Sequence, residues 1–259
     1  VALASGERIA ADAVVVNADA AAVADGHFGA DAARAVTKSP KARSLSAMTW
    51  MLRTKTDGFA LHRHNVFFSS DYAREFDEIF KRSRIPGEPT VYVCAQDRVD
   101  TDDRPADDGE RLFCLVNAPA DGDTHLYDAA EIRACEARTF DLLQRCGLTL
   151  SHSPERREVS TPSDFNRRYP ATGGALYGPA SHGWKASFQR NGSRSRIRGL
   201  YFAGGSVHPG PGVPMAALSG RLAAASLIED SRSTVVSLRA ATPGGTSTGS
   251  AMTDATRSR

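Results

Sequence analysis

Residues 199–214, GLYFAGGSVHPGPGVP, carry the most specific chemistry that can be read from this chain. Leu200–Ala203 predicts a short strand, and Pro214 suits the first turn of a helix that we expect to run to about Ile228. The free amide groups and the dipole at such a helix start can hold an electron-rich ligand group. A tight turn without a ligand is the alternative, and glycines alone would favour it. The candidate ligand contacts are Gly204, Gly205, Ser206, Val213, Pro214 and Met215.

Histidines are the candidates for proton transfer, although the sequence does not identify a general base. His182 and His208 are the two candidates. For His208 we favour a hydrogen bond that braces the loop, and for His182 neither role is favoured. His62 and His64 could bind a metal from one face of a strand, but no third ligand lies near them in the sequence. We therefore expect two surface histidines and no metal site.

Composition limits the class of protein. The chain has 259 residues, of which 41% are hydrophobic, and a net charge of +2. This balance, without a basic cluster joined to aromatic residues, argues against a nucleic-acid-binding protein. No apolar run has the length of a membrane span, and the first ten residues lack the pattern of a signal peptide. The four cysteines are scattered, so we expect reduced, buried thiols in a cytoplasmic protein. The oligomeric state is not indicated.

The glycine-rich stretch needs a sheet beside it, and the N-terminal segment supplies a candidate strand. Ala13–Val16 is continuously apolar, as in a parallel strand that is covered on both faces. Asn17 and Asp19 follow it, at the carboxyl edge where open α/β sheets bind ligands. Before it, Ser5–Glu7 predicts a tight hairpin turn.

The middle of the chain has a different pattern, with loops rather than regular helices between its strand candidates. This favours a mixed or antiparallel sheet. Helical spacing predicts two helices that cover the sheet, and a membrane-facing patch on the first is the alternative. Residues 151–198 are polar with little periodicity, and the composition from about Ser231 onward predicts a disordered tail. The expected strands are Leu45–Leu52, Asn65–Ser69, Thr90–Ala95 and Leu112–Asn117, and the expected helices are Asp71–Arg82 and Asp128–Cys146.

Five segments together resemble the carotenoid desaturase family, the flavoproteins typified by bacterial phytoene desaturase. In chain order they are ADAVVVNAD, FFSSDYAREFDEIF, PGEPTVYVCAQDRVD, TPSDF and the glycine-rich stretch ending in HPGPGVP. They cover most of the chain from Glu7 to Asp230. GGALYGPASHGWKASFQR followed by GGSVHPGPGVPMAALSGRLAA is most similar to the 1-hydroxycarotenoid 3,4-desaturases, also called methoxyneurosporene dehydrogenases.

The resemblance implies an α/β flavoprotein with a Rossmann-type FAD-binding domain and a mixed-sheet substrate domain. Residues 1–40 would be the returning part of the FAD-binding domain, 41–170 the substrate-binding domain, 171–230 the C-terminal FAD-binding segment and 231–259 a disordered tail. Family members open with a βαβ unit that holds the FAD pyrophosphate, and nothing of that kind occurs in this sequence. The chain therefore looks like the C-terminal half of such an enzyme, and alone we expect it to bind FAD weakly or not at all and to be inactive.

The implied activity is FAD-dependent desaturation of a carotenoid, in which the flavin accepts a hydride from the polyene. An apolar substrate implies a long apolar tunnel and a peripheral attachment of the cytoplasmic protein to the inner membrane surface. The alternatives are a phytoene desaturase or a carotenoid isomerase of the same family, a more distant amine-oxidase-like flavoprotein, and a non-catalytic chain without FAD.

Overall fold

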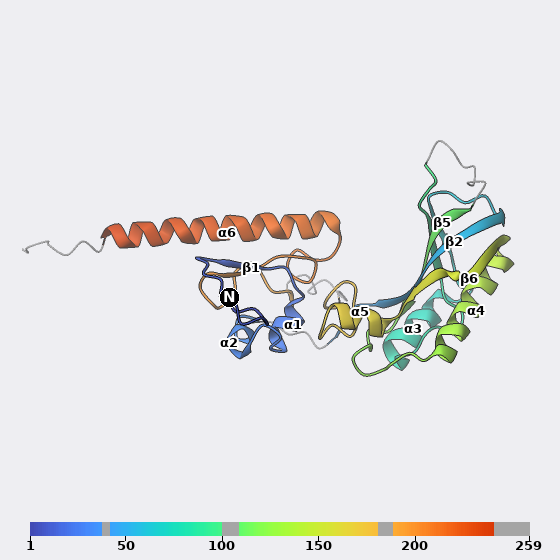
Figure 1. Ribbon diagram of the computed structural model, residues 1–259, viewed down its shortest axis with the longest axis horizontal. Coiled ribbons are helices and arrows are strands. Elements are labelled where there is room, and N and C mark those ends of the chain that lie inside the picture. Colours follow the sequence, from blue (N-terminus) through green and yellow to red (C-terminus); the bar gives the residue numbers. More distant parts are fainter. Residues whose placement is uncertain (38–41, 100–108, 181–188, 241–259) are drawn as a thin grey trace, which may run out of the picture.

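The computed structural model describes residues 1–37, 42–99, 109–180 and 189–240. These residues form a mixed α/β structure with a five-stranded and a two-stranded sheet, which stand in separate parts of the molecule (Figure 1). Helix α6 (Val213–Ala240) lies along the smaller sheet and extends away from the larger one (Figure 1). None of the helices in these ranges combines the length and the apolar character needed to cross a bilayer.

The larger sheet is antiparallel throughout, with the strand order β3-β4-β5-β2-β6. All four predicted strands are confirmed with shifted ends, and the antiparallel pairing agrees with the prediction from the loops between them. The strands are β2 (Ser46–Gly58), β3 (His64–Phe67), β4 (Val91–Ala95), β5 (Glu110–Ala118) and β6 (Leu148–Ser160).

Strand β6 lies in a segment that the sequence does not predict as a strand. The segment is mostly polar and contains Pro154. Both features are compatible with the edge of a sheet, where a strand bonds to one neighbour only. β6 pairs with β2 alone, across a register shift between Leu52 and Thr54. Backbone pairing therefore makes this segment a strand, without a side-chain pattern that would reveal it.

Both predicted helices of the middle section are confirmed. Helix α3 (Tyr72–Arg82) begins after Asp71, whose carboxylate accepts a hydrogen bond from the Arg74 amide. Helix α4 (Ala129–Arg145) begins after Asp128, which forms a capping box at the helix start. Each helix thus begins where its acidic cap in the sequence places it.

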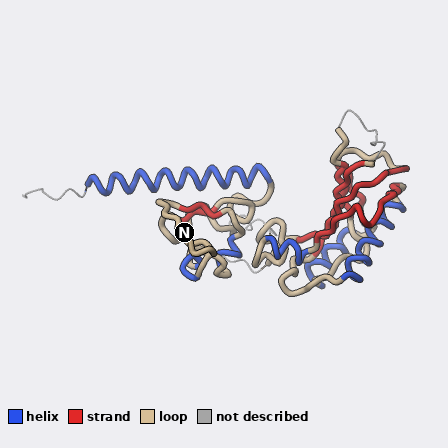
Figure 2. The backbone as a smooth tube through the Cα atoms, viewed as in Figure 1, coloured by secondary structure: helices blue, strands red, loops and turns tan. Residues whose placement is uncertain are grey.

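Helix α4 covers the face of the larger sheet that carries the core. Trp50 of β2 and Leu112 of β5 are buried on this face, and Leu142 and Leu143 of α4 pack in the same cluster. Figure 2 shows the helices gathered on one side of these strands. A further short helix, α5 (Pro162–Arg168), follows β6. The prediction that helices cover the sheet therefore holds for α4.

The smaller sheet pairs a strand from the N-terminal part of the chain with a strand from the C-terminal part. β1 (Val14–Val16) pairs in parallel with β7 (Leu200–Phe202), and the short helices α1 (Ala20–Ala24) and α2 (Ala30–Ala33) follow β1. Val15 is 47% exposed, so the expectation that both faces of the first strand are covered is wrong for the described residues. The tight turn before β1 is present, since a bridge joins the residues on either side of it.

Helix α6 is longer than the sequence predicts. It passes Ile228 and continues to Ala240, so a disordered tail from Ser231 is wrong for the first ten residues of that segment. The composition argument considers only buried apolar area, whereas a helix also gains hydrogen bonds within its own backbone. The Ser231 hydroxyl adds one more, to the Leu227 carbonyl at 2.8 Å. The remainder of the predicted tail, 241–259, lies outside the described residues.

Candidate functional site

Hydrogen bonds fix the glycine-rich loop between β7 and α6. The Ala203 amide donates to the Val16 carbonyl at 3.0 Å, so the loop leaves the sheet beside the end of β1. The Gly204 amide donates to the Ser219 hydroxyl at 2.7 Å, and this hydroxyl donates to the Ala216 carbonyl at 2.6 Å. The loop is therefore tied to α6 through buried Ser219, and the Gly204 amide is already used.

The loop and the end of β1 line one cavity of about 380 Å³. Asn17 and Asp19 border it from the end of β1, and Gly204, Gly205 and Ser206 border it from the loop. The rest of its wall comes from the segment between residues 165 and 178. The carboxyl edge of the first strand and the glycine-rich loop thus meet at one cavity. The sequence links both features to a ligand.

The two central glycines differ in what a side chain would meet. Gly204 has a φ of +120°, and a Cβ there would lie 3.2 Å from Oδ1 of Asn17. Gly205 is not in the left-handed region, and its Cβ would lie 3.5 Å from the Pro211 Cα, an ordinary contact. Backbone strain therefore requires glycine at Gly204. At Gly205 only a ligand against the backbone would require it.

The start of α6 does not line this cavity. Val213 is 85% exposed, and Pro214 and Met215 are also exposed. The Ala216 amide donates to the Gly212 carbonyl at 2.8 Å and closes the first turn. The amides of Val213 and Met215 belong to that turn and have no acceptor within the helix. The structure therefore separates the six candidate contacts into three at the cavity and three at an exposed helix start.

Arg190 is a residue of this site that the sequence does not single out. Its side chain is 3% exposed and donates to the carbonyls of Gly205 at 3.0 Å, Tyr177 at 3.1 Å and Pro179 at 2.9 Å. It thereby joins the glycine-rich loop to the neighbouring segment. Burial lowers the pKa of Arg190, while the charge of Asp19 acts in the opposite direction. Main-chain carbonyls have no sequence signature, so no motif reveals this role.

Asp19 is the acidic group of the cavity. Its carboxylate accepts a hydrogen bond from the Ala21 amide at 2.8 Å and caps α1. Burial raises the pKa of Asp19 by more than this bond and the charges of Arg190 and Arg43 lower it. The carboxyl group therefore binds a proton more readily here than in water, at the edge where the sequence expects a ligand.

Of the two histidine candidates, His208 is the one that the structure describes, and it does not line the cavity. His208 is exposed, and its main-chain amide, not its ring, braces the loop by donating to the Asn191 carbonyl at 2.8 Å. His182 lies outside the described residues. Nδ1 of His64 lies 2.8 Å from the Tyr92 hydroxyl. Within the described ranges there is no group of His, Cys, Asp and Glu side chains arranged to hold a metal ion.

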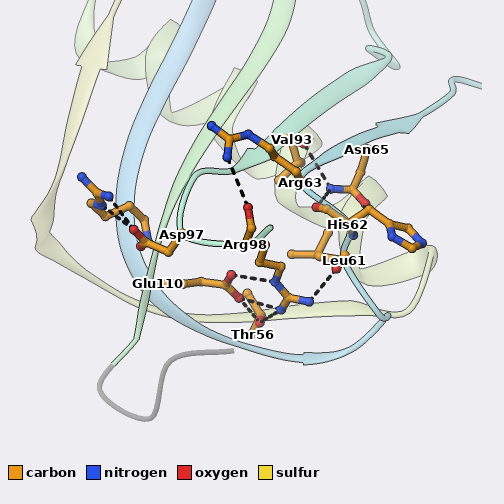
Figure 3. Close-up of polar contacts among 10 residues, drawn as sticks. Thr56, Leu61, His62, Arg63, Asn65, Val93, Asp97, Arg98 and Glu110 are labelled. Atoms are coloured by element: carbon orange, nitrogen blue, oxygen red, sulfur yellow. Dashed lines mark hydrogen bonds and ion pairs between the residues drawn. The ribbon is translucent and has the colours of Figure 1, made fainter. Parts of the chain in front are cut away.

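The most buried ion pair of the larger sheet is structural. Figure 3 shows the Arg98 guanidinium beside the Glu110 carboxylate and the Leu61 carbonyl, with Nε to Oε2 of the pair at 2.8 Å. Hydrogen bonds from Arg98 and Thr56 outweigh burial and lower the pKa of Glu110. The pair lies where β5 begins, and the opposite end of β5 is next to the start of β2. The pair therefore lies at the far end of β5 from Leu45, which precedes β2 and lines a pocket with Pro211 of the glycine-rich stretch.

Comparison with known proteins gives the family. Residues 1–228 match the family described as flavin containing amine oxidoreductase. The chain belongs to this flavin-containing family. A hydroxyneurosporene desaturase from Rubrivivax gelatinosus is 56% identical over 97% of this chain and 48% of the relative. A protein of the same name from Rhodobacter capsulatus is 43% identical over 87% of this chain and 45% of the relative.

A third relative has a different name. The 1-hydroxycarotenoid 3,4-desaturase from a Flavobacterium species is 32% identical over 70% of this chain and 37% of the relative. These names confirm the resemblance to carotenoid desaturases within the flavin-containing family. The chain spans about half the length of the two hydroxyneurosporene desaturases that it matches.

The residues at the cavity fit a flavin, the cofactor that membership of the family indicates. A flavin ring is flat and carries carbonyl and N–H groups along one edge. Gly205 offers backbone without a side chain, and the exposed Asn17 amide has no hydrogen-bond partner among the described residues. The Ser206 hydroxyl accepts a bond from the Ala20 amide at 3.2 Å and keeps its own proton available to a ligand.

Proposed function

We propose that this chain forms part of a carotenoid desaturase that introduces the 3,4 double bond of a 1-hydroxy- or 1-methoxy-carotenoid. The observation that carries the proposal is the 56% identity to the hydroxyneurosporene desaturase of Rubrivivax gelatinosus over nearly the whole chain. The matched length includes the glycine-rich loop and the end of β1. A match of this extent, which spans both walls of the cavity, supports a shared cofactor and a related substrate.

The proposed cofactor is FAD, held without a covalent bond in a Rossmann-type domain to which residues 1–40 and 171–230 contribute. Residues 41–170, with the larger sheet, would hold the substrate. When bound, the flavin supplies the acceptor for a hydride from the polyene. The chain's own part is to position the two reactants. Gly204, Gly205 and Ser206 would lie against the ring, and Arg190 would hold their backbone in place.

The start of α6 has an electrostatic part in this proposal. The amides of Val213 and Met215, together with the helix dipole, would stabilise negative charge beside the loop, and Pro214 favours the helical conformation there. The substrate itself has few polar groups, so its binding depends on apolar side chains. We also propose that the whole protein is cytoplasmic and attaches peripherally to the inner membrane, because carotenoids are dissolved in the bilayer.

The test is a chimera in which this chain replaces the matched region of the Rubrivivax gelatinosus relative. It is expressed in bacteria that accumulate 1-hydroxyneurosporene, and in parallel in bacteria that accumulate phytoene. We expect a pigment with one more conjugated double bond in the first host, and FAD in the purified chimera. The matched control is the chimera with Gly205→Val, which should fold without retaining FAD.

Each other outcome contradicts a specific part of the proposal. Desaturation of phytoene alone would favour a phytoene desaturase, and a change of double-bond geometry without an added double bond would favour an isomerase. A folded chimera that contains FAD but leaves both pigments unchanged would refute carotenoid desaturation. Full FAD content in folded Gly205→Val would show that the loop is only a tight turn.

A further inference from the structure

Helix α3 carries carboxylates on its buried side, where an amphipathic helix usually carries apolar groups. Glu75 and Glu78 are each 1% exposed. Glu75 accepts a hydrogen bond from the Thr90 amide at 3.0 Å, and Glu78 accepts one from the Gly87 amide at 2.7 Å. Hydrogen bonds therefore hold this side of the helix against the segment between α3 and β4. Its aromatic side chains lie on another side of the helix.

Four aromatic side chains form a continuous row along α3 and the residue that follows β3. We call Phe68, Tyr72, Phe76 and Phe80 the aromatic row. Successive ring centroids lie 5.8, 4.9 and 6.2 Å apart, with the first two contacts edge to face and the last stacked. Phe68 is 63% exposed, Tyr72 49% and Phe80 42%. Phe76 is half-buried among them, and an exposed apolar patch of this kind marks a contact with an apolar ligand or surface.

The aromatic row ends at a pocket that it shares with the glycine-rich loop. Phe76 and Phe80 line this pocket of about 290 Å³ together with Tyr177 and Pro211. The Pro211 Cα is 3.5 Å from the position that a Cβ of Gly205 would occupy. The row therefore leads along α3 to the loop whose backbone would touch the flavin.

We propose that the aromatic row is the binding track of the linear polyene and positions its reacting carbons at the glycine-rich loop. This inference rests on the proposed function. Helical geometry places Arg74, Asp77 and Lys81 on a different side of α3, so no charged residue interrupts the row. A conjugated chain can stack on successive rings, because its flat π-system matches their faces and edges. A row that served only as a bilayer contact would not need to end in a pocket at the loop.

The test measures polyene binding by the 259-residue chain. Lycopene in detergent micelles is achiral, so circular dichroism in its visible bands arises only when the protein holds it in one handed conformation. We expect this signal with the unchanged chain and at least a fivefold loss of it with Phe76→Ser/Phe80→Ser. The matched control is Phe59→Ser, because Phe59 is also 42% exposed but packs on Phe67 and does not line the pocket. Far-ultraviolet dichroism and a thermal scan confirm that each variant is folded.

Three results would overturn the inference. These are no induced signal with the unchanged chain, an undiminished signal with the folded double variant, and an equal loss with Phe59→Ser. In parallel, binding of the chain and its variants to vesicles of phosphatidylcholine and phosphatidylglycerol is measured. A double variant that loses vesicle binding but keeps the lycopene signal would show that the row contacts lipid and not substrate. The proposed function fails separately, since a chain that binds lycopene through the row can still form a chimera without desaturase activity.

Discussion

Replacing Arg190 by methionine tests whether one buried side chain holds the glycine-rich loop. Arg190 is nearly inaccessible and donates to three carbonyls, of Gly205, Tyr177 and Pro179. Methionine keeps the unbranched apolar stem of the side chain but has no group that can donate a hydrogen bond. All three carbonyls then lose their donor, and Asp19 loses a neighbouring positive charge.

The size of the effect follows from the burial of these carbonyls. A buried acceptor without a donor costs about 1–3 kcal/mol, and these bonds are only partly buried. The low end of the range gives about 3 kcal/mol for Arg190→Met, a large share of a typical stability of about 5–15 kcal/mol. Arg190→Lys keeps the charge but cannot reproduce the planar set of donors. Its stability should therefore lie between that of the unchanged chain and that of Arg190→Met.

The assay is urea unfolding of the 259-residue chain, with the FAD content of the chimera as a second measurement. The matched control is Arg194→Met, because Arg194 is exposed and pairs with Glu229 and Asp230 at the surface, where we expect little change. Both Arg190 variants should also retain less FAD per folded protein. Unfolding midpoints of Arg190→Met and Arg190→Lys equal to that of the unchanged chain would refute the role of this side chain.

Three further predictions concern other groups. Gly204→Ala should destabilise the chain by about 1–3 kcal/mol in urea unfolding because of its positive φ, whereas Gly205→Ala should be nearly neutral; equal losses would contradict this assignment. Burial alone would raise the pKa of Glu78, but bonds from a backbone amide and two arginines lower it from 4.5 to about 2. The contribution of Glu78 to the free energy of unfolding, about 3 kcal/mol, should therefore be fully present above pH 4.5 and lost as the pH falls towards 2. Glu78→Gln should weaken the pH dependence of the unfolding free energy in this range. A thiol reagent at pH 8 should label exposed Cys146 rapidly. Burial raises the pKa of Cys114 to about 12, so the reagent should label Cys114 only on unfolding. Fast labelling of Cys114 in the Cys146→Ser chain would show that the core opens.

The sequence predicts elements well where side-chain pattern and caps agree. Helix α4 starts at Asp128 because a carboxylate there can cap it, and β4 is revealed by the alternation of Val91, Val93 and Ala95. Prediction fails where backbone bonds alone decide the structure. Strand β6 exists because β2 offers it a partner, and the last turns of α6 continue a helix that has already been nucleated.

The candidate site was predictable in part for a related reason. The sequence locates Asn17 and Asp19 at the end of a strand and the glycines after another strand, and parallel pairing of β1 with β7 brings them together. It does not reveal Arg190, because that side chain recognises main-chain carbonyls. It also does not reveal that the first residues of α6 lie outside the lining of this cavity, because the length of the loop before them is not readable as a direction.

These observations divide the site into groups that hold the loop and groups that remain available to a ligand. Ser219 and Arg190 are buried, and each makes a hydrogen bond to the loop backbone. Asn17 is exposed in the cavity, and Gly205 offers bare backbone without strain. Changes at the first pair should therefore reduce stability and flavin retention together, whereas changes at the second pair should reduce flavin retention alone. A loop that served only as a tight connection would show no such separation, because every substitution in it would act through stability.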